Sequence, residues 1–112
     1  MNLHEVKKIL SAHVVTGDEN LDREVLSACG CDLMSDVLAF VKDQALLLTG
    51  LMNPQVIRTA EMMDMKAVIF VRGKTPSEEI VSLAKESDMV LMTTELPLYL
   101  SCGKLYSEGL YK

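Results

Sequence analysis

Three continuous apolar runs in the second half of the chain do most to limit what it can fold into. Each run ends in Thr or Gly, a short polar loop follows, and a proline then precedes an amphipathic segment. The copies are residues 45–50 before Pro54, residues 67–73 before Pro76, and residues 90–94 before Pro97. Strands that are apolar at every position are buried on both faces, which is typical of parallel sheets covered by helices. The runs therefore predict an α/β fold.

The remaining segments complete this architecture. Strands are expected at residues 12–16, 24–29, 45–49, 67–71 and 90–93. Helices are expected at residues 2–11 and 32–42, after each of the first two prolines, and at residues 97–106. A chain of 112 residues has room for one hydrophobic core. We therefore expect one domain over residues 1–112, with a mostly parallel sheet of four to five strands and helices on both faces.

Three helix starts carry capping residues. Asn2 and Glu5 have the spacing of a capping box, in which each side chain accepts a hydrogen bond from the other's backbone. Asn53 precedes the proline that opens one helix, and Thr75 with Glu78 predicts a second capping box around the proline of the next.

The helix over residues 32–42 has two candidate caps, Asp32 and Ser35. Its inward side is predicted to carry Leu33, Val37, Phe40 and Val41. Asp32 and Asp36 would also suit acid–base work or a hard cation. No histidine or third ligand lies near them in the sequence, so the helix-capping interpretation is favoured.

Composition excludes several classes of function. The net charge is −5 and the basic residues are scattered, whereas nucleic-acid binding requires a clustered basic patch. No apolar stretch approaches the roughly 20 residues of a membrane span. Three cysteines, an odd number, predict reduced thiols and a cytoplasmic protein. No cofactor is expected.

The cysteines do not form a recognisable metal site. Cys29 and Cys31 have C-x-C spacing, Cys102 is far away in the sequence, and His13 is the only histidine that a neighbouring strand would bring close. Structural zinc sites use two pairs at C-x₂₋₄-C spacing. Buried, unreactive thiols are the favoured interpretation.

The loops after the three apolar runs predict a ligand site, because ligands of such sheets bind at the carboxyl ends of the strands. Hydroxyls, glycines, helix N-termini and two cations come together there, which suits an anion. The expected binding residues are Thr49, Gly50, Asn53, Arg72, Gly73, Lys74, Thr75, Thr93 and Thr94. Strand endings and solvated charges would produce the same pattern without a ligand.

Catalytic motifs are missing. Gly73-Lys74-Thr75 ends like a P-loop, but position 68 holds Val where that motif needs its first glycine. The nucleophile-elbow and dinucleotide-binding patterns are also absent. We therefore expect a protein that is not an enzyme.

The stretch from Cys31 to Ala39, C-D-L-M-S-D-V-L-A, resembles the DRTGG domain family. The resemblance continues through the later runs to Gly103-Lys104-Leu105-Tyr106. The chain is also similar to the N-terminal domain of HPr kinase/phosphorylase and to the DRTGG region of phosphate acetyltransferases. The resemblance implies a small α/β regulatory or ligand-sensing module, often dimeric. This chain has Leu51-Met52 where many relatives carry an Asp-Arg pair.

The expected function is a non-catalytic regulatory or ligand-sensing module that binds an anionic small molecule, such as a metabolite or nucleotide. An accessory subunit that docks to a metabolic enzyme is the alternative, and a minimal phosphate-handling enzyme using Asp32 or Asp36 is a minor one. A homodimer is expected because 49% of the residues are hydrophobic, which leaves apolar surface on a small domain. Leu51, Met52 and residues 98–111 are the candidate contacts.

Overall fold

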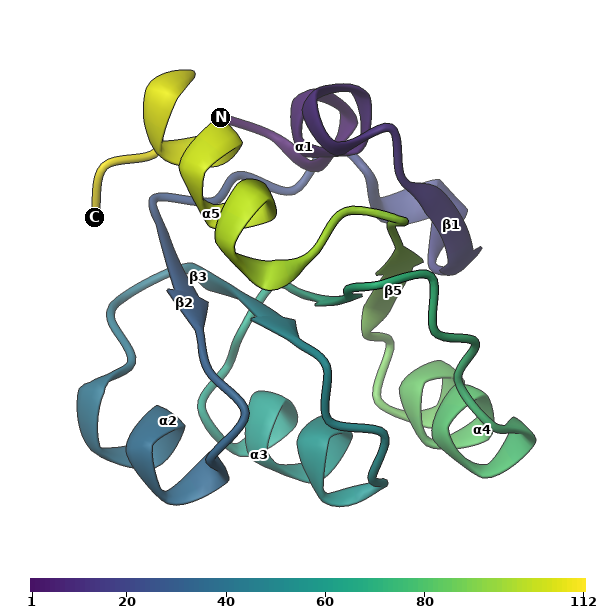
Figure 1. The fold of residues 1–112 in the computed structure, drawn as a ribbon. Helices are drawn as coiled ribbons and strands as arrows, with labels where there is room; N and C mark the ends of the chain where they lie inside the picture. Colours follow the sequence, from purple (N-terminus) through teal and green to yellow (C-terminus); the bar gives the residue numbers. More distant parts are fainter.

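A five-stranded sheet with helices on both faces forms the molecule, as the computed structural model of all 112 residues shows (Figure 1). The strands are β1 (His13–Thr16), β2 (Ser27–Gly30), β3 (Ala45–Thr49), β4 (Ala67–Phe70) and β5 (Val90–Thr93). The helices are α1 (Leu3–Leu10), α2 (Met34–Phe40), α3 (Gln55–Met62), α4 (Glu78–Glu86) and α5 (Leu98–Ser107), with a 3₁₀ turn η1 (Asp18–Asn20) after β1. No helix is both long and apolar enough to cross a lipid bilayer.

The strand order is β1-β5-β4-β3-β2, and the four strands from β2 to β5 are parallel. Only β1, at one edge, runs antiparallel, and its pairing with β5 is irregular between Val14 and Thr16. The predicted α/β class and the mostly parallel sheet are therefore confirmed.

The sheet separates two apolar cores, and each buried strand contributes side chains to both. Leu46 and Leu48 of β3 pack in the cluster that includes residues of α1 and α5, while Leu47 packs in the cluster shared with α2, α3 and α4. Successive side chains of a strand point to opposite faces, so a strand covered on both sides must be apolar throughout. Every residue of β3 and β4 is buried. Figure 1 shows α1 and α5 on one side of the sheet and the other three helices below it.

Two boundaries near the start of the sheet differ from expectation. The second strand begins at Ser27 instead of residue 24, because Glu24 forms an isolated antiparallel bridge with Asn2. The helix expected at residues 32–42 is only Met34–Phe40, so Leu33 and Phe40 do not reach the core and are 58% and 74% exposed. A helix of two turns has an apolar side too short to bury both ends.

Some of the capping predictions are confirmed and others are wrong. The capping box of Asn2 and Glu5 is confirmed. Asn53 is not the cap of α3, because Pro54 occupies the cap position, although the Asn53 side chain accepts from the backbone N–H of Gln55 at 2.8 Å. The cap at Thr75 is wrong, since α4 begins at Glu78 and Ser77 accepts from the Ile80 N–H at 3.3 Å. The proline between them is buried in the connection and lies outside the helix.

Replacing Asn2 with Ala should lower the free energy of unfolding by about 1 kcal/mol, because the first turn of α1 loses its side-chain acceptor. Urea denaturation followed by circular dichroism measures the change. Asn2→Ser is the matched control, since serine keeps an acceptor at this position. Equal losses in both variants would contradict a capping role.

Candidate functional site

The carboxyl ends of β2 to β5 meet at one edge of the sheet, and a single residue there, Gly50, joins three connections. The backbone N–H of Gly50, just after β3, donates to Oδ1 of Asp32 at 2.8 Å. The carbonyl of Gly50 accepts from Nζ of Lys74 at 2.6 Å. Asp32 belongs to the β2–α2 connection and Lys74 to the β4–α4 connection, so opposite charges hold the two polar groups flanking Gly50.

Asp32 also accepts a hydrogen bond from the hydroxyl of Thr49, which donates to the same Oδ1 at 2.9 Å. The Thr49 oxygen in turn accepts from the backbone N–H of Leu51 at 3.1 Å. The expectation that Asp32 or Ser35 caps α2 is therefore wrong: Leu33 occupies the cap position and no side chain caps the helix. The carboxylate turns to β3 because two donors are available there.

The hydrogen bond from the Gly50 N–H, with that from Thr49 and the nearby charges of Lys74 and Arg72, holds the pKa of the Asp32 carboxyl below its ordinary value, although partial burial opposes the shift. Donors directed at a carboxylate favour its ionised form. Asp32 is therefore a stable anion in this site and a poor acceptor of a reaction proton.

A second set of backbone bonds ties the β4–α4 connection to the segment that follows β5. Arg72 and Gly73 have positive φ angles of 63° and 65°. In this conformation the Arg72 N–H donates to Leu96 O at 2.9 Å and the Gly73 N–H to Thr94 O at 2.8 Å. A Cβ at position 73 would collide with the carboxylate of Glu95, so glycine is required by both space and backbone.

The predicted binding residues thus gather at one edge, but several of their polar groups are already paired. Thr49 is buried against Asp32, and the buried Thr94 hydroxyl donates to Leu10 O at 2.8 Å. The Asn53 side chain accepts from the Gln55 N–H. The Arg72 side chain is exposed and makes no ion pair or side-chain hydrogen bond, Thr75 is exposed, and Thr93 is half-buried.

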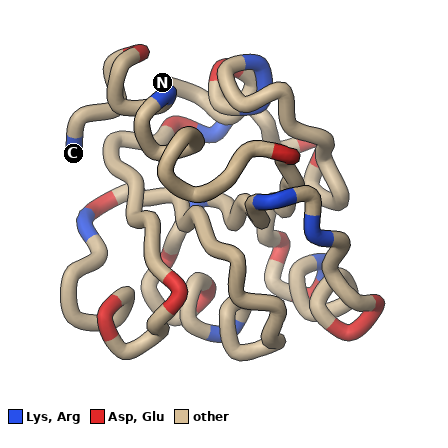
Figure 2. The backbone as a smooth tube through the Cα atoms, in the orientation of Figure 1, with Lys and Arg blue, Asp and Glu red and all other residues tan.

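The edge is open and carries both signs of charge. Figure 2 shows basic positions on the connection between β4 and α4, and an acidic position on the segment leading into α5. None of the four surface cavities is lined by any of the predicted binding residues. A ligand here would lie on the surface, against side chains that project from the loops.

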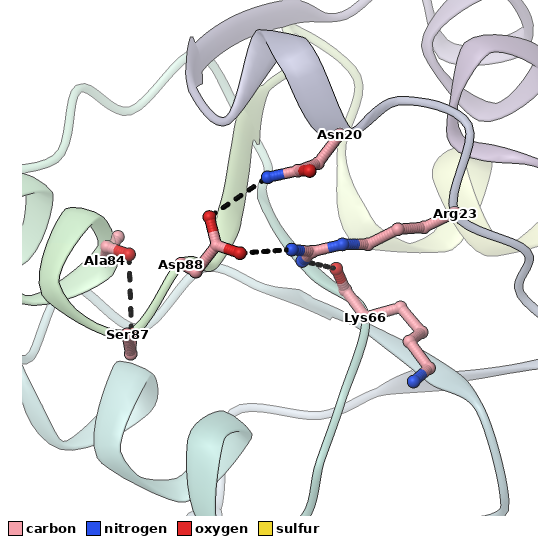
Figure 3. Close-up of polar contacts among 6 residues, drawn as sticks. All are labelled: Asn20, Arg23, Lys66, Ala84, Ser87 and Asp88. Carbon is pink, nitrogen blue, oxygen red and sulfur yellow. Dashed lines mark hydrogen bonds and ion pairs between the residues drawn. The ribbon is translucent and has the colours of Figure 1, made fainter.

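The opposite, amino edge of the sheet holds a different polar cluster, shown in Figure 3. Arg23 pairs with Asp88 at 3.0 Å and donates to Lys66 O at 3.5 Å, while Asn20 donates to Asp88 at 3.0 Å. These contacts fasten the segment after η1 to the starts of β4 and β5. The sequence alone does not reveal this cluster, because its members lie up to 68 residues apart.

The three cysteines are free and half-buried. Burial raises the pKa of the Cys29 and Cys102 thiols, so both favour the protonated form, which is the less nucleophilic one. No group of three His, Cys, Asp or Glu side chains is placed to hold a metal ion.

Asp32→Ala should lower the free energy of unfolding by about 1 kcal/mol at neutral pH, because the Gly50 N–H and the Thr49 hydroxyl lose their acceptor. Since folding lowers the pKa of Asp32, its contribution is complete above the unfolded value of about 4 and disappears as the pH falls through the folded value.

Urea titrations of both proteins from neutral to acidic pH measure this. Glu86→Ala, which removes an exposed carboxylate without a hydrogen-bond partner, is the control. An Asp32→Ala deficit that persists unchanged into strong acid would contradict the assignment.

Comparison with known proteins places this fold in a family. The model of the DRTGG domain family matches residues 5–100. No curated protein matches. The structure is similar to the CBS and DRTGG domains of the regulatory region of Clostridium perfringens pyrophosphatase, solved in complex with its activator diadenosine tetraphosphate. The TM-score is 0.76 at 18% identity, over 93% of this chain and 45% of the other, so the chain spans less than half of that structure. The chain belongs to the DRTGG domain family.

Proposed function

We propose that this DRTGG domain is a non-catalytic regulatory module that binds an anionic small molecule at the carboxyl edge of its sheet. The observation that carries the proposal is the pair of cations on the β4–α4 connection. Lys74 is fixed on the Gly50 carbonyl at 2.6 Å, and Arg72 lies two residues earlier with its guanidinium unpaired. An exposed guanidinium on an anchored loop suits bidentate binding of a phosphate or carboxylate.

Nucleotides are the ligand class we favour. The similar pyrophosphatase regulatory region was solved with a dinucleoside polyphosphate, and that protein's ligand supports the choice without defining the site in this chain. The binding set we propose is the one expected from the sequence, with Arg72 and Lys74 supplying the charge. Thr75 is exposed and Thr93 is half-buried, whereas the other two threonines of that set are buried.

Docking to a metabolic enzyme is the second function, favoured by apolar side chains on the surface. Tyr99 and Tyr106 of α5 are 86% and 60% exposed. Phosphate-handling catalysis has the least support, because Asp32 is held as a hydrogen-bonded anion and Asp36 lies on the first turn of α2. The proposed setting is the cytoplasm, in which three free thiols stay reduced, and the proposed form is a homodimer.

Calorimetric titration with ATP and with ADP tests the binding proposal. Arg72→Ala should weaken binding about tenfold, the effect of losing one hydrogen bond to a charged group, with little change in the melting temperature, because the side chain makes no ion pair or hydrogen bond within the domain. Lys85→Ala on α4 removes an exposed charge away from this edge and serves as the control. Equal affinity in wild type and Arg72→Ala would contradict the assignment of Arg72.

A further inference from the structure

Carboxylates flank the two cations at the carboxyl edge of the sheet. Arg72 and Lys74 follow β4, while Figure 2 shows an acidic position beside them on the segment that leads into α5. Asp32 follows β2 and Glu95 follows β5, and β4 lies between these two strands in the sheet. All four charged side chains are exposed, and a Cβ at Gly73 would collide with the Glu95 carboxylate. A phosphate chain attracted by the two cations is therefore opposed by a carboxylate on each side.

Asp32 presents one unpaired oxygen on a restrained carboxylate. Its Oδ1 accepts from the Gly50 N–H at 2.8 Å and from the Thr49 hydroxyl at 2.9 Å, whereas no ion pair engages Oδ2. The lowered pKa of this carboxyl keeps it ionised at neutral pH. Because two donors hold Oδ1 in place, Oδ2 remains available to a cation at this edge.

Lys74 lies on the same side of Gly50 as Asp32. A Cβ added at Gly50 would be 3.6 Å from Lys74 Nζ and 3.9 Å from Asp32 Oδ1. The two groups do not form an ion pair, and the ammonium donates to the Gly50 carbonyl at 2.6 Å. A phosphate bound by Lys74 would therefore lie near an uncompensated carboxylate.

A magnesium ion carried by the phosphates removes this conflict. Mg²⁺ takes oxygen ligands, keeps several waters, and is typically held by one or two carboxylates together with the phosphates of a ligand. Asp32 offers one such carboxylate oxygen. No group of three His, Cys, Asp or Glu side chains is placed to hold a metal ion, so the ion has to arrive with the phosphates that complete its coordination.

We propose that this edge binds the magnesium complex of a nucleoside polyphosphate, with the phosphates on Arg72 and Lys74 and the metal ion facing Oδ2 of Asp32. The ion converts Asp32 from a charge that repels the phosphates into a direct or water-mediated partner of the complex. A metal-free nucleotide meets both carboxylates without compensation and binds weakly. The inference rests on the proposed anion site and states in which form the ligand occupies it.

Calorimetric titration of the full chain with ATP, once in excess MgCl₂ and once in EDTA at equal ionic strength, tests the inference. The magnesium complex should bind about tenfold more tightly, because an attractive contact replaces a repulsive one near the surface. This comparison uses the wild-type chain and needs no variant.

Asp32→Asn should abolish the preference for the magnesium complex. Asparagine keeps an oxygen that can accept from the Gly50 N–H and the Thr49 hydroxyl, and it removes only the charge. Asp36→Asn is the matched control, since it removes the same charge from the first turn of α2 and should leave the preference intact.

Manganese locates the ion directly. Mn²⁺ takes the same oxygen ligands as Mg²⁺, and as a paramagnetic ion it broadens the NMR signals of nearby amides. Titration with the manganese complex of ATP should broaden the amide signals of Thr49 and Gly50 before those of Glu95 and Leu96.

The outcomes separate this inference from the proposed function. Equal or tighter binding of ATP in EDTA overturns the magnesium complex and leaves the proposed anion site intact. A preference that survives in Asp32→Asn, or broadening centred on Glu95, overturns the assignment of the metal to Asp32. Absence of ATP binding under both conditions removes the proposed nucleotide site together with this inference.

Discussion

The two peptide groups flanking Gly50 hold the carboxyl edge of this sheet together. The Asp32 carboxylate, from the loop after β2, accepts a hydrogen bond from the Gly50 N–H, and the Lys74 ammonium, from the loop after β4, donates one to the Gly50 carbonyl. These two hydrogen bonds join the loops after β2, β3 and β4, which are distant in sequence, next to strands that the sheet already holds in place. A ligand that competes for Lys74 therefore acts on the loops of β2 and β3 as well as on its own.

The two edges of the sheet have different roles in this account. At the amino edge, Arg23 and Asp88 satisfy each other and fasten surrounding segments. At the carboxyl edge, Lys74 is engaged by a neutral carbonyl and Arg72 by nothing. Although both charges act on Asp32, neither cation forms a direct ion pair, so both retain their capacity to bind an anion, which is why we propose the ligand site at this edge despite the absence of a deep cavity.

Sequence predicts the central strands well, because complete burial leaves an unmistakable apolar run. Residues 45–49 and 90–93 are strands with the bounds expected. The position of Asp32 could not be predicted in this way. Its partners lie 17 and 18 residues away, and a carboxylate just before a helix has the same local pattern whether it caps that helix or reaches the next strand.

The failed cap at Thr75 has a similar cause. Two overlapping patterns compete at this helix start. Thr75 and Ser77 each carry a hydroxyl three residues before a backbone N–H that it could cap, that of Glu78 or that of Ile80. Burial of the intervening proline decides in favour of Ser77, and that burial depends on tertiary packing. Periodicity alone predicts Phe40 in the core, but the helix ends before a further turn could cover it.

Anion binding at the charged carboxyl edge is the central proposal, and mapping of backbone amide chemical shifts during titration with ATP tests it most directly. The account predicts that the first and largest changes occur at Gly50 and at Arg72, Gly73 and Lys74. Changes centred on α1 or α5, or no changes at millimolar ATP, would contradict it.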